Sequence, residues 1–491
     1  MAIGGMGYNS SAYKAGTINP TAPRPPSSKR SEDDWLSNSY YNILDRSYNL
    51  HRNSSIPAAI TRTMLQYVAG SGLTPIISNE NTMRIWKSWT KSADITGTKT
   101  MSLIYKDIIA AQVESGDVLV TAPVDTFAPL DTIRTRIQLI SGARVRTPSD
   151  FKEKKSPRGN KVILGVEFDS VGREIGYWVC NNDYDKSFVD DSTNYRYIPR
   201  YADSGRFSAF LLRRPDKMFC GQTRGLPMIT NIIEEIETIA ELWEAALQKG
   251  RTNASMNAFV EVENPVDLRA SMGAVDTDGN DSELVTAAKT MQTVGYLDGG
   301  SIIAVPQGTR VTPVVSSGNI DLDVLLLRSN SYVASAMCIP YEILFKDFSR
   351  TNFSSGKMGL DAFYRTAKSY TDYNSIVYDM IFRLVMAEAK FKGLLSQDED
   401  TSVAWVGPGR LDVNPLQSAK AENQRIHDRT ETNSKVCADY GILYADVLKT
   451  IAKEKELERE ILGEEIPRPW EMEERELRVT EIEADEEGGE E

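Results

Sequence analysis

The feature that most constrains the fold is one long helical pattern in the second half of the chain. Apolar residues recur at helical spacing from about Ser355 to Lys392, and Gly393 follows. They are Leu360, Phe363, Ala367, Tyr370, Val377, Ile381 and Leu384. At ~1.5 Å per residue such a helix would be roughly 55 Å long, enough to cross a domain. The pattern therefore predicts a chain organised around one long helix that packs a core.

A proline junction separates this helix from the one before it. Because the residue before a proline disfavours the helical conformation, a helix that arrives at Ile339-Pro340 must stop there. A short aromatic and polar segment follows, and Ser354-Ser355 offers a side-chain cap for the long helix. The sequence thus predicts a helix, a loop and a second helix.

The first half of the chain mixes helical and strand patterns. Residues 32–69 have helical spacing interrupted at Pro57, and Met101 to Glu114 forms a second helical pattern closed by Gly116. Strand patterns occupy residues 118–121, 137–140, 161–168 and 175–180, with Gly172 marking a hairpin. We expect an α+β lobe here and mainly helices in the second half.

Two helical patterns flank a polar insertion. The first begins after Pro227, with apolar residues near the 3.6 period and acids on another face. These acids are Glu234, Glu235, Glu237, Glu241 and Glu244, and Gly250 offers an end to the helix. Residues 251–318 are rich in Gly, Asn, Asp, Ser and Thr, with strand-like pieces at 258–262, 293–297 and 301–305. A helical pattern over 320–337 follows.

The two ends of the chain differ in charge. Residues 1–30 hold four basic side chains, no acid and four prolines, which is typical of a flexible arm. Residues 453–491 carry 17 acidic and 6 basic side chains, so most of the net charge of −13 lies in the tail. Such a block stays solvated. It also argues against tight DNA binding, which requires clustered Lys and Arg, but permits DNA to slide past without sticking.

Composition excludes several classes of protein. At 491 residues the chain exceeds the ~250–300 at which a single core stops growing, so more than one lobe is expected. No stretch approaches the ~18 consecutive apolar residues of a membrane span, and the first residues do not have the pattern of a secretory signal. We expect no membrane partner, and we expect the protein to be synthesised in a cytosol.

Motifs for catalysis or cofactor binding were not found. Four dispersed cysteines, Cys180, Cys220, Cys338 and Cys437, are expected to be buried free thiols, and only His51 and His427 offer imidazoles. Gly356-Lys357 resembles the end of a phosphate loop, but Thr351 and Met358 stand where that motif needs Gly and Ser or Thr. We therefore expect no enzyme activity, no cofactor, no metal and no catalytic residue.

Six short motifs, in order along the chain, resemble the lambda-type portal proteins of tailed bacteriophages. They are Gly70-Ser71-Gly72-Leu73-Thr74-Pro75; Ser115-Gly116-Asp117-Val118; Gly165 to Asp169 with Gly172-Arg173-Glu174 and Tyr177-Trp178; Arg214-Pro215 with Gly221 to Pro227; Cys338 to Gly359; and Trp405 to Gly409 with Val413-Asn414-Pro415. Each string alone is a weak signal, but their order is specific. Asn414 and Lys357 depart from the family's usual Asp and Arg, and the resemblance covers roughly residues 35–455.

This resemblance implies an α+β portal-type subunit with the following domains. A flexible basic arm (1–34) precedes an α/β wing (35–227), a first stem helix (228–250), a small mixed clip (251–318) and a second stem helix (319–338). A tunnel-loop region (339–357), a long wing helix with its following segment (358–412), a helical crown (413–455) and an acidic tail (456–491) complete the chain.

The resemblance also implies a function and partners. The chain would form a homo-oligomeric ring, dodecameric as in similar proteins, at a unique capsid vertex. Double-stranded DNA would be packaged and ejected through this ring, which would dock the terminase large subunit and then the head-tail adaptor, and would meet the major capsid and scaffolding proteins. The protein would occur in the virion and, during assembly, in the host cytoplasm. Alternatives are another virion structural protein, such as a shell or adaptor subunit, or a packaging enzyme.

Two sets of candidate site residues follow. In the region that would project into the tunnel, the candidate residues are Lys346, Arg350, Asn352 and Lys357. Of these, Arg350 and Asn352 are expected to touch DNA phosphates transiently, without reading bases. On the first stem helix, Glu234, Glu237, Glu241 and Glu244 are expected to form an acidic face that borders the tunnel. For the loop the alternative is an ordinary connector with its aromatic residues packed inward. For the helix it is an ordinary solvated face.

Overall fold

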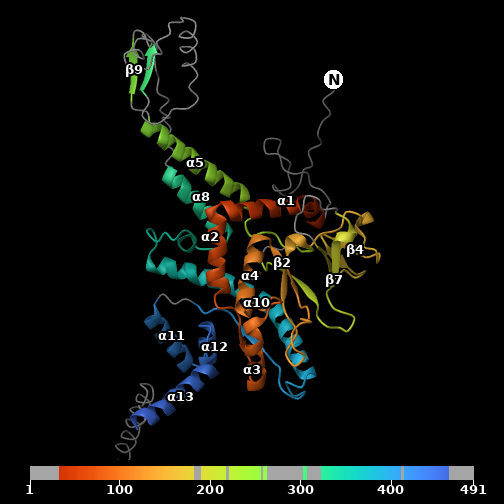
Figure 1. Ribbon diagram of the computed structural model, residues 1–491. Helices are drawn as coiled ribbons and strands as arrows, with labels where there is room; N and C mark the ends of the chain where they lie inside the picture. The colour runs from red at the N-terminus through yellow and green to blue at the C-terminus, as the bar shows by residue number, and fades with distance from the viewer. Residues whose placement is uncertain are drawn as a thin grey trace, which may run out of the picture.

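The structure is a computed structural model that describes residues 32–181, 190–216, 220–255, 258–262, 302–306, 322–410 and 414–463. A central α+β body carries a projection of two helices at one end and a group of three helices at the other (Figure 1). The α+β class expected from the sequence is confirmed. None of the helices in the described ranges has the length and apolar character needed to cross a membrane.

The helices of the body are arranged around α4 (Met101–Glu114). The others are α1 (Glu32–Asn53), α2 (Ser55–Met64) continued by η2 (Leu65–Ala69), α3 (Glu80–Trp89), α9 (Tyr341–Phe345) and α10 (Phe353–Phe391). Short 3-10 turns lie at η3 (Thr90–Ser92), η4 (Gly142–Arg144), η5 (Lys152–Lys154) and η6 (Ser192–Asn194). The long helix α10 extends across the body (Figure 1), as the spacing of its apolar residues predicts.

Two antiparallel sheets complete the body. In the first, β2 (Asp117–Thr121) lies between β3 (Gln138–Ser141) and β8 (Ala209–Arg213). The second has the order β4 (Lys161–Ile163), β5 (Val166–Phe168), β6 (Glu174–Cys180) and β7 (Tyr195–Pro199). A further antiparallel pair joins β1 (Thr74–Ile76) to β11 (Ala404–Val406), which ties the segment after α10 to the N-terminal half of the body.

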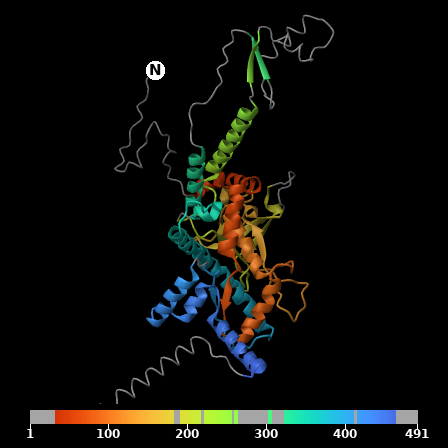
Figure 2. The ribbon, with the colours of Figure 1, turned by 90° about the vertical axis from the view of Figure 1, so that its left-hand side faces the viewer.

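The projection consists of α5 (Ile233–Ser255) and α8 (Leu322–Ala336), with β9 (Ala258–Val262) and β10 (Ile302–Pro306) paired in parallel near its far end (Figures 1 and 2). At the other end of the body lie α11 (Pro415–His427), α12 (Asn433–Asp439) and α13 (Tyr444–Leu462). These three helices contain no buried residue.

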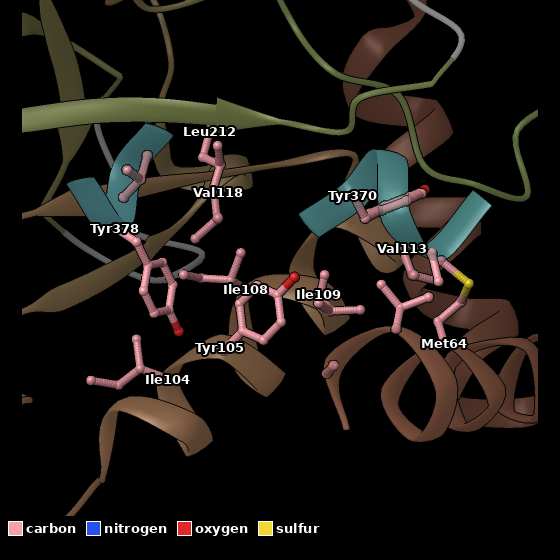
Figure 3. Packing of buried hydrophobic residues seen from close by; sticks show 14 of the residues in the cluster. Met64, Ile104, Tyr105, Ile108, Ile109, Val113, Val118, Leu212, Tyr370 and Tyr378 are labelled. Carbon is pink, nitrogen blue, oxygen red and sulfur yellow. The ribbon is translucent and has the colours of Figure 1, made fainter. Parts of the chain in front are cut away.

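The main core lies where α4 packs between α2, α10 and the first sheet. Figure 3 shows Met64 of α2, Tyr105 and Ile108 of α4, and Tyr370 and Tyr378 of α10 in this cluster. At its centre the amides of Gln112 and Asn374 bond to each other, at 2.8 Å and 3.1 Å. Because both side chains are fully buried, this reciprocal pair fixes how α4 lies on α10.

Several boundaries agree with the sequence. The helix at Met101–Glu114 and the strand at Ala258–Val262 have the predicted ends. Gly116 takes a φ of 85°, the left-handed conformation that commonly ends a helix. The hairpin at Gly172 is present, with a φ of 88°. The predicted piece at 293–297 lies outside the described residues, as do most of the N-terminal arm and residues 464–491.

Other boundaries differ for local reasons. The predicted strand 161–168 is a hairpin, because Leu164 and Gly165 turn the chain with φ values of 47° and 86°. The first helical region breaks at Ser54, and Pro57 lies in the first turn of α2, where a proline is tolerated. The long helix is capped by Asn352 and not by Ser354 or Ser355.

The helix α5 starts and ends later than predicted. Turns over residues 227–232 replace the expected first residues of the helix, and Gly250 does not end it, since the helix continues to Ser255. Likewise α13 continues to Leu462, past residue 455, where the crown was expected to give way to the acidic tail. Of the four thiols that we expected to be buried, only Cys180 is buried, whereas Cys220 and Cys338 are exposed and Cys437 is partly buried.

Candidate functional site: the loop before the long helix and the acidic helix face

The predicted tunnel loop is an ordered turn between α9 and α10. Lys346 ends α9 in the left-handed conformation, with a φ of 59°. The carboxylate of Asp347 then accepts hydrogen bonds from the backbone N–H and the hydroxyl of Ser349, at 3.1 Å and 2.6 Å. These bonds hold the pKa of Asp347 below its ordinary value. The Thr351 hydroxyl donates to Glu342 at 2.6 Å, so the loop is also tied to α9.

Of the three predicted cations of this region, Arg350 lies close enough to Asp347 for its charge to help lower the pKa of that carboxyl. Lys346 and Arg350 are exposed on the loop, and Lys357 is half-buried in the first turns of α10. Within the described ranges, none of these three side chains forms a hydrogen bond or an ion pair. The fold therefore places three positive charges without ion-pair partners within 12 residues, at the start of the long helix.

The two aromatic residues of the loop are not packed inward. Phe348 keeps 59% of its surface exposed and Phe353 keeps 52%. They border a hollow of about 200 Å³ whose floor includes Ile343 and Leu360. In this subunit the loop therefore differs from the connector with inward-packed aromatics that we considered as the alternative.

The fourth predicted residue, Asn352, is the N-cap of the long helix. Its side-chain oxygen accepts a hydrogen bond from the Ser355 N–H at 2.8 Å and caps α10. Replacing Asn352 with alanine should lower the free energy of unfolding by ~1 kcal/mol, whereas Asn352→Asp, which keeps the cap, should cost little. Urea denaturation of both variants checks this expectation. Equal losses in both variants would show that the cap is unimportant.

The four glutamates of the predicted acidic face of α5 differ in their contacts. Glu234, Glu241 and Glu244 are exposed. Glu237 bonds instead to Arg46 of α1 at 2.6 Å and helps to fix the base of the projection to the body. Glu234 also borders an open cleft of about 520 Å³ between α5 and α8, where Arg328 and Tyr332 form the opposite wall. All four acids therefore reach solvent, since the Glu237 side chain is itself 41% exposed beside Arg46.

A buried ion pair that the sequence reasoning missed joins two of the six motifs. Arg224 and Asp117 are both fully buried. The guanidinium Nε and Nη2 bond to the two carboxylate oxygens at 2.7 Å and 2.8 Å. The remaining three N–H groups donate to the carbonyls of Gly142, Val145 and Leu164, at 2.7–2.9 Å. All five donors of the guanidinium are therefore satisfied.

This pair, with the backbone around it, forms a hub between the body and the projection. The N–H of Gly225 donates to Asp117 at 3.0 Å, and the Tyr40 ring of α1 lies 4.7 Å from the Arg224 guanidinium. A Cβ at Gly225 would lie 2.0 Å from the Gly116 carbonyl, and one at Gly142 would lie 2.0 Å from Asp117. Side chains do not fit at these glycines. The hub fixes the segment that leads into α5.

The sequence contains both charged residues of the hub within motifs, but it does not show that these residues pair. Asp117 and Arg224 stand in motifs that also contain Gly116 and Gly225, yet 107 residues separate the two charges. Nothing in the spacing indicates that the motifs meet. Among the described residues, no group of three or more His, Cys, Asp or Glu side chains is placed to hold a metal ion.

Comparisons with known proteins identify the family of this chain. The family model of the phage portal protein, lambda family, matches residues 22–370, well over half of the sequence. The chain therefore belongs to the lambda family of phage portal proteins. It is 21% identical over 394 residues to the portal protein of Escherichia phage N15, covering 75% of this chain and 71% of that protein. It is also 21% identical over 414 residues to portal protein B of Escherichia phage lambda, covering 77% and 73%.

Two of the solved structures that resemble this chain come from a gene transfer agent particle. The neck of the native particle, computed with C12 symmetry, matches with a TM-score of 0.40 and 12% identity over 81% of this chain and 93% of that chain. The neck of the empty particle, computed with C6 symmetry, gives a TM-score of 0.42 and 11% identity over 85% and 95%.

Proposed function

We propose that this protein forms a ring at one capsid vertex, through which double-stranded DNA is packaged and ejected. The observation that carries the proposal is family membership across residues 22–370, a range that includes most of the body, the projection and the loop before α10. Copies of the chain would be the ring's subunits, twelve in a complete ring. The protein would act in the virion and would be assembled in the host cytoplasm.

The local geometry supports a conduit more than a tight DNA-binding site. The loop offers Lys346, Arg350 and Lys357, which form no hydrogen bond or ion pair with the described residues, while α5 exposes Glu234, Glu241 and Glu244. A few cations among acids would give weak, salt-sensitive contacts with phosphates, which suits DNA that must slide. In this proposal the loop faces the channel, and the acids of α5 border it further along.

The proposal includes partners at the far end of the projection. The segment between α5 and α8 would dock the terminase large subunit during packaging and the head-tail adaptor afterwards. The major capsid and scaffolding proteins would surround the ring. The role is structural, and we propose no chemical reaction for the chain.

Purified protein is expected to form closed rings with a central hole. The physical reason is that α5 and α8 expose apolar side chains, including Trp243, Leu247 and Tyr332, which neighbouring copies would cover. Head-to-tail contacts between copies either close into rings or grow into filaments. Mass photometry and negative-stain imaging test this expectation. Monomers alone across a wide concentration range would contradict it.

A further inference from the structure

A hollow of about 310 Å³ lies between the body and the first turn of α13. Its floor is apolar and consists of Met83 and Trp86 of α3, Met101 of α4 and Tyr378 of α10. Asp446, in the first turn of α13, lies on one wall. The volume is at the lower end of the ~300–1,000 Å³ typical of ligand pockets, so the hollow suits one large apolar side chain.

The rim of this hollow carries opposite charges on its two sides. Lys87 and Lys91 are exposed on the α3 side, and neither forms a hydrogen bond or an ion pair with the described residues. Thr100 caps the start of α4 at the same rim, where the positive end of the helix dipole adds to the two charges. Asp446 stands on the α13 side. A complementary segment therefore offers a cation to Asp446, a large apolar side chain to the floor and acids to the lysines.

The C-terminal tail of this chain carries these groups in that order. The sequence after α13 includes Ile466-Pro467-Arg468-Pro469-Trp470-Glu471, followed by Glu473 and Glu474. Trp470 is the one aromatic residue from position 464 to 491. The two prolines favour an extended chain, in which residues 468 and 470 point to the same side. Arg468 and Trp470 can thus face Asp446 and the apolar floor together.

The length of the tail allows Trp470 to return to the hollow. Leu462, the last residue of α13, lies 16 residues after Asp446, which is ~24 Å along the helix. Gly463 then takes a φ of 77°, the left-handed conformation that ends the helix. The eight residues from Leu462 to Trp470 span ~25 Å at the ~3.1 Å rise per residue of a proline-rich extended chain. The two lengths match.

The face of α13 along this route is apolar and uncovered in the described structure. Leu457 lies eleven residues after Asp446, about three helical turns, so both lie on the same face. Ile461 lies one turn beyond Leu457. Leu457 is 54% exposed and Ile461 69%. A chain that returns from Gly463 would cover both side chains.

We propose that the tail folds back along α13 and inserts Trp470 into the hollow of its own subunit. Arg468 then lies beside Asp446, and the glutamates that follow Trp470 lie beside Lys87 and Lys91. The acidic residues further along the tail remain in solvent. This inference does not depend on ring formation.

The docked tail would hold the helices α11, α12 and α13 on the body. These helices contain no buried residue. Lys449 of α13 pairs with Glu80 of α3 at 2.7 Å, and Figure 2 shows the two helices beside each other. Both partners are exposed, and exposed ion pairs contribute little to stability. An indole buried in the hollow adds the apolar contact that this junction otherwise lacks.

Photo-cross-linking in the full-length protein tests where residue 470 lies. Trp470→benzoylphenylalanine keeps an aromatic side chain, and on illumination its ketone bonds to C–H groups that it touches. Mass spectrometry should find the cross-link on Met83 or Met101 of the same chain. The same replacement at Ile482, twelve residues further along the tail, is the control and should cross-link to neither.

Oxidation by hydrogen peroxide measures how firmly the segment docks. Met83 lines the hollow and is partly exposed, so a docked indole should shield its sulfur. Trp470→Ser should raise the rate of Met83 oxidation about ten-fold, which corresponds to ~1.4 kcal/mol of docking free energy. Trp470→Phe keeps a ring and should raise it less. Met358, which is 73% exposed, should oxidise equally in all variants, and Met386, which is 2% exposed, should stay protected while the fold is intact.

The outcomes are separated by the mass of the cross-linked product. Cross-links within one chain, together with faster Met83 oxidation in Trp470→Ser, would support the proposal. Cross-links that join two chains would overturn it, because the tail would then occupy a neighbouring subunit. Equal oxidation of Met83 in the unaltered chain and in Trp470→Ser would also overturn it. So would cross-links to the hollow that are as frequent from position 482 as from position 470.

Discussion

Replacing Asp117 with alanine is expected to lower the free energy of unfolding by about 3–5 kcal/mol, because it leaves the Arg224 guanidinium buried without its counter-charge. The fully buried guanidinium has no route to solvent in the native fold. The same change removes the acceptor for the Gly225 N–H. The shift in the midpoint of urea denaturation measures the loss.

Two further variants separate the ion pair from general damage. Asp379→Ala removes the partly buried partner of Arg383, whose own side chain is 77% exposed, and should cost less than about 0.5 kcal/mol. The double variant Asp117→Asn with Arg224→Met removes both charges. Its loss in free energy of unfolding should therefore be smaller than the sum of the losses in the single variants Asp117→Asn and Arg224→Met. A loss of under about 1 kcal/mol in Asp117→Ala would contradict the hub's role.

The second large effect is expected at Arg350. Arg350→Glu should leave stability and ring formation unchanged, since the side chain is exposed and makes no hydrogen bond or ion pair in the described part of the structure. Reversing the charge in every subunit should reduce the DNA that is packaged or retained. With purified rings, the slope of log affinity for duplex DNA against log salt should fall by about one for each phosphate that Arg350 no longer neutralises.

A matched control for this variant lies further along the same helix. Arg383 is also exposed on α10, but its sequence position puts it 33 residues from Arg350, near the C-terminal end of the helix. Arg383→Glu should therefore leave packaging unchanged. Normal packaging by Arg350→Glu, with rings confirmed by imaging, would reject a DNA-contact role for Arg350.

Local patterns predicted much of this fold. The periodicity of α4 and α10 is strong because these helices bury long apolar faces, and their ends are marked by polar caps and glycine. Short elements were harder to predict. The strands β1 and β11 have three residues each and form only because α10 brings distant segments together. The turn at Leu164 was missed because a leucine rarely adopts a positive φ.

The candidate sites were predictable only in part. The cations at Lys346, Arg350 and Lys357 could be selected from the loop's composition, and the structure leaves them unpaired. The cap that Asn352 forms on α10 depends on local backbone geometry. The pairing of Glu237 with Arg46 depends on a contact between residues 191 positions apart in the sequence. The Asp117–Arg224 pair depends on the tertiary arrangement, which periodicity does not encode.

The most direct test of the account is a cryo-electron microscopy structure of the purified protein. We expect a closed ring in which residues 346–357 of every subunit face the central channel. A ring in which this loop lies outside the channel would contradict the proposed path of DNA. Absence of any ring would contradict the proposed function itself.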